Sequence, residues 1–156
     1  MKPNADIEVV QDRISSGRRQ GHHYMALLGL RIYDPIKIYE RVRDGFSYSA
    51  FEHFQRNASL SAGALAELTQ IPPRTLARRR ELGRLEPAES DRLVRFARVF
   101  GRALELFEGA TDAARAWLSA PQRALGGATP LALAATDVGA SEVLNLIGRL
   151  EHGNPA

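Results

Sequence analysis

The sequence predicts an all-α fold in which an N-terminal helix-turn-helix bundle is followed by a small helical domain. Two patterns support this prediction. Apolar residues recur at three- and four-residue steps, as in Leu93, Phe96 and Phe100, and this spacing places them on one helical face. The segments that carry this spacing begin at capping residues or prolines and end at glycines, as helices do. No stretch alternates apolar and polar residues for long enough to predict a β-strand.

The composition is that of a globular protein, and it excludes several classes of protein and of functional site. Of its 156 residues, 44% are hydrophobic and 25% are charged, which is unlike the composition of a disordered chain. No cysteine is present, so disulfides, thiolate metal sites and a cysteine nucleophile are excluded. The longest apolar run, residues 24–30, is too short to span a membrane, and no apolar segment follows the N-terminal charges. We therefore expect a cytoplasmic protein that has no membrane partner.

The net charge of +3 is unevenly distributed along the chain. Residues 72–85 contain five arginines and one glutamate, whereas residues 111–156 contain three arginines and four acidic residues. A positively charged centre suits a polyanion, and a slightly acidic end suits a protein partner. The charge distribution therefore predicts two different binding functions.

Three parts follow one another along the chain. Residues 1–24 are polar with little periodicity, and we expect them to form a flexible or irregular arm. Residues 25–108 form the expected helix-turn-helix bundle, and residues 109–156 form the smaller domain, which is too short for an independent core and must pack on the long preceding helix, a second copy or a partner. Gly139 is expected to separate the last two helices. The helices are expected over residues 35–44, 47–57, 62–69, 72–82, 87–108, 111–118, 129–137 and 141–150.

Residues 62–81 have the spacing of a helix-turn-helix unit, which lays its second helix in the DNA major groove. Ala66, with Leu65 before it, supplies the small residue that is needed where the two helices cross. Ile71 is placed to fill the corner after the turn, and Leu76 is placed to anchor the inner face of the second helix. All of these residues have the spacing that the unit requires.

Two positions depart from the usual pattern of this unit. The turn carries Gln70 where glycine is common, and a positive φ at that residue would cost about 1 kcal/mol. The late inner-face position carries Arg79 in place of a large apolar residue. We expect Arg79 to lay its aliphatic stem over the core while its guanidinium reaches a DNA phosphate.

The face of the second helix opposite Leu76 is expected to contact DNA. Arg74 and Arg78 lie one turn apart, and arginine commonly contacts guanine O6 and N7 through two hydrogen bonds. The neighbouring polar side chains are better placed for phosphates, which position a protein without specifying a sequence. An arginine-rich face is often only solvated, but its occurrence within the helix-turn-helix spacing favours DNA binding. The expected DNA contacts are Ser61, Arg74, Thr75, Ala77, Arg78, Arg79 and Arg80.

The C-terminal segment combines several uncommon features. Trp117-Leu118 and Pro121 precede the run Leu-Gly-Gly-Ala-Thr-Pro-Leu over residues 125–131, and a Thr-x-x-Gly motif and a final helix that ends at Gly153 follow. Trp117 is a large apolar anchor, and the threonine and proline at 129 and 130 are typical of a helix start. By themselves these features also fit a plain helical subdomain with Trp117 in its core.

This order of residues resembles the toxin-binding domain of the Xre/MbcA/ParS antitoxins, and the preceding helix-turn-helix resembles the Xre-like domain of that family. The likeness covers roughly residues 36–153. It implies a type II antitoxin that neutralises a RES-domain toxin, which degrades NAD or uses it for ADP-ribosylation, by occluding the active site of the toxin. It also implies that the antitoxin binds double-stranded promoter DNA and represses its own operon.

The resemblance further implies that the closing helix and the tail to Ala156 approach the NAD pocket of the toxin. Arg149 and Glu151 would pair with charges in that pocket, and Leu144 or Leu146 is expected to stay exposed until the toxin binds. The implied toxin contacts are Trp117, Thr129, Pro130, Val143, Leu146, Ile147, Arg149, Leu150, Glu151 and His152.

No set of residues indicates an active site, a metal site or a cofactor site. His22 and His23 are adjacent in the polar N-terminal segment, and His53 lies beside two phenylalanines and is expected to pack at the rim of the core. Neither a His-Glu-x-x-His motif nor a glycine-rich phosphate loop occurs. We therefore expect a protein that is not an enzyme and binds no cofactor.

Two other hypotheses remain open from the residues alone. The chain could be a protein-interaction module whose helix-turn-helix is only structural, or a stand-alone helix-turn-helix transcriptional regulator whose C-terminal domain dimerises. We expect a homodimer within a larger toxin–antitoxin complex, because one recognition helix covers few bases and paired helices contact paired half-sites. The dimer interface is expected within residues 36–54 or on the long helix after Pro87.

Overall fold

The computed structural model describes residues 5–17 and 21–153, and every regular element in these residues is a helix. The predicted all-α fold is confirmed. Parts of the expected arm, residues 1–4 and 18–20, and the tail residues 154–156 that were expected to approach the toxin lie outside the described residues. None of the described helices is long and apolar enough to cross a membrane. The elements are α1 (Ala5–Ser15), the 3₁₀ helix η1 (His23–Leu28), α2 (Pro35–Asp44), α3 (Tyr48–Asn57), α4 (Ala62–Leu68), α5 (Pro73–Leu82), α6 (Pro87–Leu106), α7 (Thr111–Leu118), the 3₁₀ helix η2 (Arg123–Leu125), α8 (Pro130–Leu133) and α9 (Asp137–Glu151).

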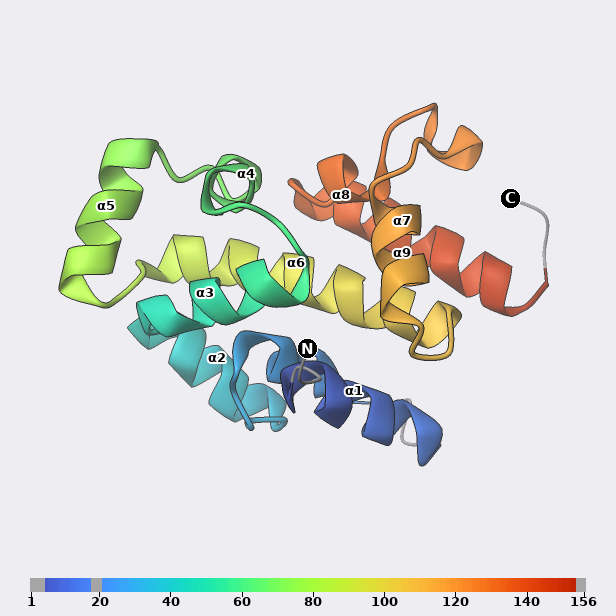
Figure 1. Ribbon diagram of the computed structural model, residues 1–156, viewed down its shortest axis with the longest axis horizontal. Coiled ribbons are helices and arrows are strands. Elements are labelled where there is room, and N and C mark those ends of the chain that lie inside the picture. The colour runs from blue at the N-terminus through green and yellow to red at the C-terminus, as the bar shows by residue number, and fades with distance from the viewer. Residues whose placement is uncertain (1–4, 18–20, 154–156) are drawn as a thin grey trace.

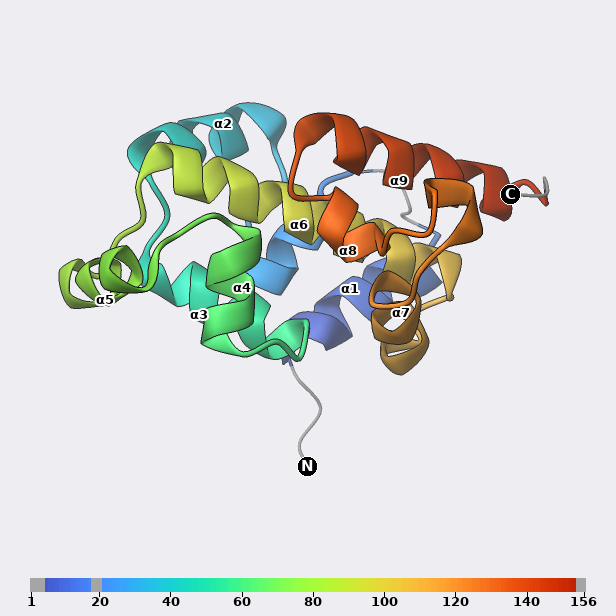
Figure 2. The same ribbon diagram turned by 90° about the horizontal axis from the view of Figure 1, so that it is seen from above.

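The 20-residue helix α6 runs through the middle of the molecule (Figures 1 and 2). It contacts η1, α1, α2, α7 and α9, so both ends of the chain pack on it. Its start is fixed by Pro87 at the first turn and by a capping box between Glu86 and Glu89. Its apolar face, which includes Leu93, Phe96, Phe100 and Leu104, is buried at 2% exposure or less. Of the three supports that were expected for the C-terminal segment, namely the long helix, a second copy or a partner, the structure shows the first.

The structure corrects the expectation of a flexible or irregular arm at the N-terminus. Residues 5–15 form α1, which packs against η1, α3 and α6. Ile7, Val10 and Ile14 follow one another at helical spacing, and all three are buried in the common core. Three apolar residues among many polar ones give a weak sequence signal, and their burial depends on helices that lie far along the chain.

Polar side chains of α1 also bind distant elements. The buried carboxylate of Asp6 lies 2.6 Å from Nδ1 of His53 and accepts a hydrogen bond from Asn57 at 3.1 Å, so it joins α1 to α3. Gln11 donates to the carbonyl of Gly109 at 2.9 Å, just before α7. His53 therefore lies at the rim of the core, as the sequence predicts.

A second correction concerns Gly139, which lies inside α9 and does not separate two helices. Helix α8 ends at Leu133, and the hydroxyl of Thr136 accepts a hydrogen bond from the backbone of Gly139 at 3.0 Å to cap α9. A Cβ atom at position 139 would lie 1.9 Å from the carbonyl oxygen of Leu133. Glycine is required there because the end of α8 passes too close for any side chain.

Arginine side chains bind carbonyl oxygens at or just after the ends of other helices. A helix leaves its last four carbonyls without intrahelical partners, and a nearby guanidinium satisfies them while complementing the helix dipole. The four helices served in this way are α2, α4, α8 and α3. The contacts are Arg84 to Asp44 and Gly45, both 3.1 Å, Arg92 to Thr69 at 2.6 Å, Arg95 to Ala135 at 3.2 Å and Arg115 to Asn57 at 2.7 and 3.1 Å.

Replacing Val10 with alanine tests whether α1 belongs to the core. Val10 is completely buried, so the loss of two methyl groups is expected to lower the free energy of unfolding by about 1–3 kcal/mol. Urea denaturation followed by circular dichroism measures this change. The control Glu8→Ala, at an exposed position of the same helix, is expected to shift stability by less than about 0.5 kcal/mol. An unchanged unfolding midpoint for Val10→Ala would show that α1 lies outside the cooperative core.

Candidate functional site

The four positions that define the helix-turn-helix spacing are buried together between α4 and α5. Leu65 and Ala66 are 0% and 3% exposed, and Ile71 after the turn is 3% exposed. Leu76 anchors the inner face of α5 at 7% exposure. The predicted roles of these residues in the packing of the unit are therefore confirmed.

The turn between the two helices closes as a Schellman motif. The backbone of Ile71 donates to the carbonyl of Ala66 at 2.8 Å, and the backbone of Gln70 donates to Glu67 at 3.1 Å. Gln70 has φ +60°, so a non-glycine residue takes the left-handed conformation that the turn requires. The carbonyl of Thr69 accepts the hydrogen bond from Arg92, so α6 holds this turn in place. The recognition helix α5 therefore leaves the turn in a fixed direction.

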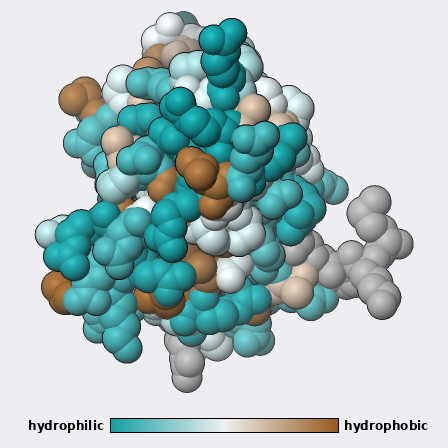
Figure 3. All heavy atoms as spheres, turned by 90° about the vertical axis from the view of Figure 1, so that its left-hand side faces the viewer, coloured by the Kyte–Doolittle hydropathy of each residue, from teal (hydrophilic) through white to brown (hydrophobic). Residues whose placement is uncertain are grey.

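The outward face of α5 presents two arginines that have no internal partner. Arg74 and Arg78 are exposed, and neither makes a hydrogen bond or ion pair with another described residue. Ala77 lies exposed between them, so a surface can approach the helix closely. The end of the molecule that α5 forms is mostly hydrophilic, with separate apolar spots (Figure 3). This face fits the predicted approach to a polyanion.

The other expected DNA contacts on and beside α5 differ in how accessible they are. Arg80 is exposed, and its guanidinium lies 5.7 Å from the ring centre of Tyr48, whose hydroxyl accepts a hydrogen bond that raises the pKa of Arg80. Thr75 is half-buried. The exposed hydroxyl of Ser61 accepts the backbone hydrogen bond of Ala64 at 3.0 Å, which makes it the N-cap of α4. It can still donate its own proton.

Arg79 does not point toward a DNA surface, and this corrects the expectation of a phosphate contact. Its side chain is 12% exposed, and Nε donates to Glu89 at 2.8 Å, while Nη1 lies 3.9 Å from Glu86. The hydrogen bond to Glu89 raises the pKa of Arg79 above its ordinary value. The sequence could not show this contact, because it forms only when α6 folds back beside α5.

Fewer of the expected toxin contacts are accessible on the C-terminal segment than the resemblance implied. Val143, Leu146 and Ile147 are at most 1% exposed, so they are core residues and not contacts for a partner. The sequence pattern gave these positions an apolar face but could not show that this face packs against α6. Leu144 is half-buried. Pro130 is also buried, at the start of α8.

The remaining expected contacts line the outer side of the C-terminal segment. Arg149, Glu151 and His152 are exposed at the end of α9, and Leu150 is half-buried. Trp117 is half-buried and lies 6.3 Å, between ring centres, from Phe107 of the turn after α6. Thr129 is half-buried as well, because its hydroxyl caps α8.

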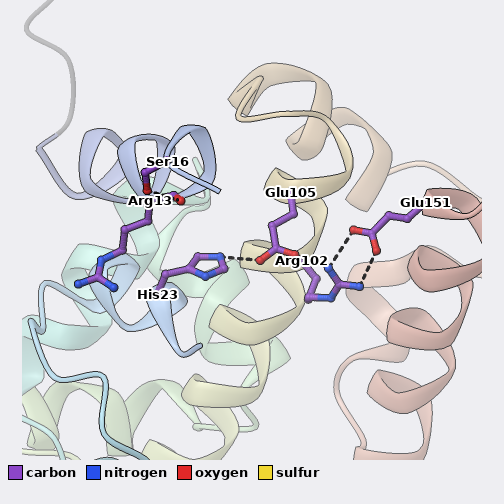
Figure 4. A network of polar contacts seen from close by, with 6 residues as sticks. All are labelled: Arg13, Ser16, His23, Arg102, Glu105 and Glu151. Atoms are coloured by element: carbon purple, nitrogen blue, oxygen red, sulfur yellow. Dashed lines mark hydrogen bonds and ion pairs between the residues drawn. The ribbon is translucent and has the colours of Figure 1, made fainter. Parts of the chain in front are cut away.

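A network of charged side chains joins η1, α6 and the end of α9, as Figure 4 shows. Arg102 on α6 binds both Glu105 on the same helix and Glu151 on α9, and the bond to Glu151 raises the pKa of Arg102. Nε2 of the buried His23 lies 3.0 Å from Glu105, and burial lowers the pKa of His23. The sequence did not predict a role for His23, Arg102 or Glu105 at this site, because a 49-residue separation between Arg102 and Glu151 gives no local signal.

Comparisons with known proteins identify the two parts of the chain. The family model of the antitoxin Xre-like helix-turn-helix domain matches residues 37–98, and that of the antitoxin Xre/MbcA/ParS C-terminal toxin-binding domain matches residues 102–153. The first match ends and the second begins within α6. Helix α6 is therefore shared between the two matched regions.

Three curated relatives are similar over most of this chain, and each is named "Antitoxin Xre". The protein from Yersinia enterocolitica is 41% identical over 81% of this chain and 86% of its own length. The protein from Photorhabdus laumondii is 35% identical over 72% of this chain and 76% of its own. The protein from Pseudomonas putida is 30% identical over 85% of each chain.

Replacement by alanine is predicted to affect stability differently at two neighbouring arginines on α5. Arg79→Ala is expected to lower the free energy of unfolding by about 1–2 kcal/mol, because it removes a charged hydrogen bond to the buried carboxylate of Glu89. Arg78→Ala is expected to leave stability unchanged within about 0.5 kcal/mol, because Arg78 has no partner among the described residues. Chemical denaturation of the two variants measures both values. Equal stability of the two variants would contradict the assignment of Arg79 to the core.

Proposed function

The chain belongs to the Xre antitoxins of type II toxin–antitoxin systems, and from that premise we propose that it occludes the active site of a RES-domain toxin and represses its own operon as a homodimer. Members of this family are not enzymes; they bind DNA through the helix-turn-helix and a toxin through the C-terminal domain. The toxin-binding domain distinguishes the chain from a stand-alone transcriptional regulator. The protein-interaction module without DNA binding remains the outcome that the first experiment below can reveal.

The exposed pair Arg74 and Arg78 carries the proposal for operator binding. These arginines lie one turn apart on a helix whose start is fixed by the Schellman turn and by Arg92. Because neither has an internal partner, no ion pair among the described residues must break before a guanine is contacted. Arg80 and Ser61 are placed to the side for phosphates. Two such helices in a homodimer would contact paired half-sites one helical turn apart.

The first experiment measures binding of Arg78→Ala to the promoter of its own operon by fluorescence anisotropy at several salt concentrations. We expect a loss of about 1–3 kcal/mol that is confined to one base position, since a bidentate arginine specifies a single guanine. Arg123→Ala, an exposed position in η2 that lies outside the helix-turn-helix and outside the segments expected to form the dimer interface, is the matched control and should bind as the wild type does. A loss that is uniform over all sequences, with a salt slope reduced by about 1, would make Arg78 a phosphate contact. Failure of the wild-type protein to bind this promoter, with or without toxin, would overturn the DNA half of the proposal.

The exposed end of α9 carries the proposal for toxin inhibition. Arg149 and His152 lie on the last turns of the helix and make no hydrogen bond or ion pair with another described residue. Both can reach outward into a pocket of a partner, and arginine is one of the residue types that are enriched among the contacts that carry most of the binding energy. Trp117 and Thr129, which are half-buried elsewhere in the C-terminal segment, would also contact the toxin. The identity of the toxin as a RES-domain enzyme is inferred from the family resemblance.

The second experiment uses the double variant Arg149→Glu/His152→Glu. A deletion from Glu142 onward is less informative, because it would also remove the core residues Val143 and Ile147. We expect the double variant to bind the toxin at least about 10-fold more weakly and to release its NAD-consuming activity, since losing a central contact costs more than 1 kcal/mol. Arg41→Glu is the charge-reversal control.

Two measurements decide the outcome of this second experiment, and a separate co-purification identifies the toxin. Unchanged promoter binding by the double variant would show that it is folded. Full inhibition of the toxin by the double variant would overturn the blocking role of the end of α9. Co-purification with the product of a neighbouring RES-domain reading frame would establish the partner, and a neighbouring toxin of another class would contradict it.

A further inference from the structure

The last turn of α9 is attached to α6 by a paired hydrogen bond. Nη1 and Nη2 of Arg102 donate to the two carboxylate oxygens of Glu151 at 2.9 and 2.8 Å. Such a fork-to-fork arrangement fixes the orientation of both planar groups as well as their separation. The carboxylate of Glu151 is thus directed inward to α6, although the resemblance implied a contact with the toxin.

The guanidinium of Arg102 is itself held from the opposite side. Glu105, one turn further along α6 and 4% exposed, accepts a second hydrogen bond from Nη1 of Arg102. His23, 3% exposed, contacts the other oxygen of Glu105 and joins the network to η1 (Figure 4). The guanidinium of Arg102 is therefore held in place by Glu105, and through it the carboxylate of Glu151 is also held in place.

We propose that Arg102 and Glu151 act as a clamp that positions the toxin-binding end of α9 before the toxin arrives. Neither residue needs to touch the toxin for this role. Helix ends fray when nothing holds them, and a frayed turn must be ordered at the moment of binding at a cost in affinity. With the last turn held on α6, Arg149 and His152 are presented in one orientation. This inference rests on the proposed function of that end of the helix.

The clamp also determines which side chains the end of α9 presents. The carboxylate of Glu151 is directed to Arg102, whereas Arg149 and His152 are exposed and make no hydrogen bond or ion pair with another described residue. The tip of the helix therefore presents Arg149 and His152 outward.

A double-mutant cycle on toxin binding by the full-length chain tests the clamp. Glu151→Gln keeps the shape of the side chain but removes its charge, and Arg102→Lys keeps a cation beside Glu105 but loses the paired geometry. Each single variant is expected to bind the toxin about 5-fold more weakly. The double variant is expected to bind no more weakly than the weaker single variant, because both changes break one interaction. If Glu151 contacts the toxin directly, the two losses will instead multiply, and the proposal is wrong.

The control cycle pairs Arg102→Lys with Arg149→Gln. Arg149 is a proposed toxin contact with no link to the clamp, so these two losses are expected to multiply. Hydrogen exchange of the toxin-free protein supplies a second readout. Backbone amides of residues 148–152 are expected to exchange faster in both clamp variants than in the wild type, while their promoter affinity stays unchanged.

The combined results separate the two proposals. Unchanged exchange in Glu151→Gln would overturn the clamp, whatever the toxin affinity is. Faster exchange with unchanged toxin affinity would also overturn it, since a positioned end would then be irrelevant to binding. If Arg149→Glu/His152→Glu binds the toxin normally while the clamp variants exchange faster, the proposed function of the α9 end fails and the clamp is only a structural contact.

Discussion

Unsatisfied carbonyl oxygens at the ends of short helices are the constraint that this fold has to meet. Many of its helices have ten residues or fewer, so helix ends make up a large part of the backbone. Arginines from neighbouring segments bind these carbonyls at four places, and Arg92 and Arg115 make the shortest of these bonds. The positive charge of these four arginines is therefore structural. On α5, by contrast, Arg74 and Arg78 stay exposed and make no hydrogen bond or ion pair with another described residue.

Helix α6 connects the two functional surfaces by a rigid element. Arg92 and Arg95 lie about one turn apart on it and bind the turn before α5 and the segment before α9, respectively. Further along the same helix, Arg102 holds the other end of α9. Helix α5, which we propose contacts DNA, and helix α9, whose end we propose contacts the toxin, are thus both held by α6. This arrangement explains why the two matched family regions adjoin inside α6 and not at a flexible linker.

Local signals made much of the fold predictable from the sequence. Prolines, capping residues and the buried helix-turn-helix positions act within a few residues, and they placed the helices from α2 to α7. The errors arose where a residue's role depends on a distant neighbour. Arg79 was expected to contact a DNA phosphate. The sequence does not show that the turn between α5 and α6 brings Glu89 beside it. Val143 was expected to face a toxin because an amphipathic helix does not indicate which neighbour covers it. Gly139 was expected to separate two helices because glycine is typical of helix ends. Its place inside α9 is explained by the close approach of the Leu133 carbonyl, which the sequence does not show.

The packing of α1 has a consequence for how the chain matures on the ribosome. Its apolar side chains Ile7, Val10 and Ile14 are synthesised before α3 and α6, on which this helix packs, and Gln11 binds a carbonyl 98 residues later. Contacts of such wide sequence separation form only after the intervening chain has been synthesised. In an unfinished chain the residues of α1 are therefore accessible to proteases, and they become protected once α3 and α6 have been synthesised and have packed against them. The supply of functional antitoxin thus depends on translation running to the end of α6 and beyond.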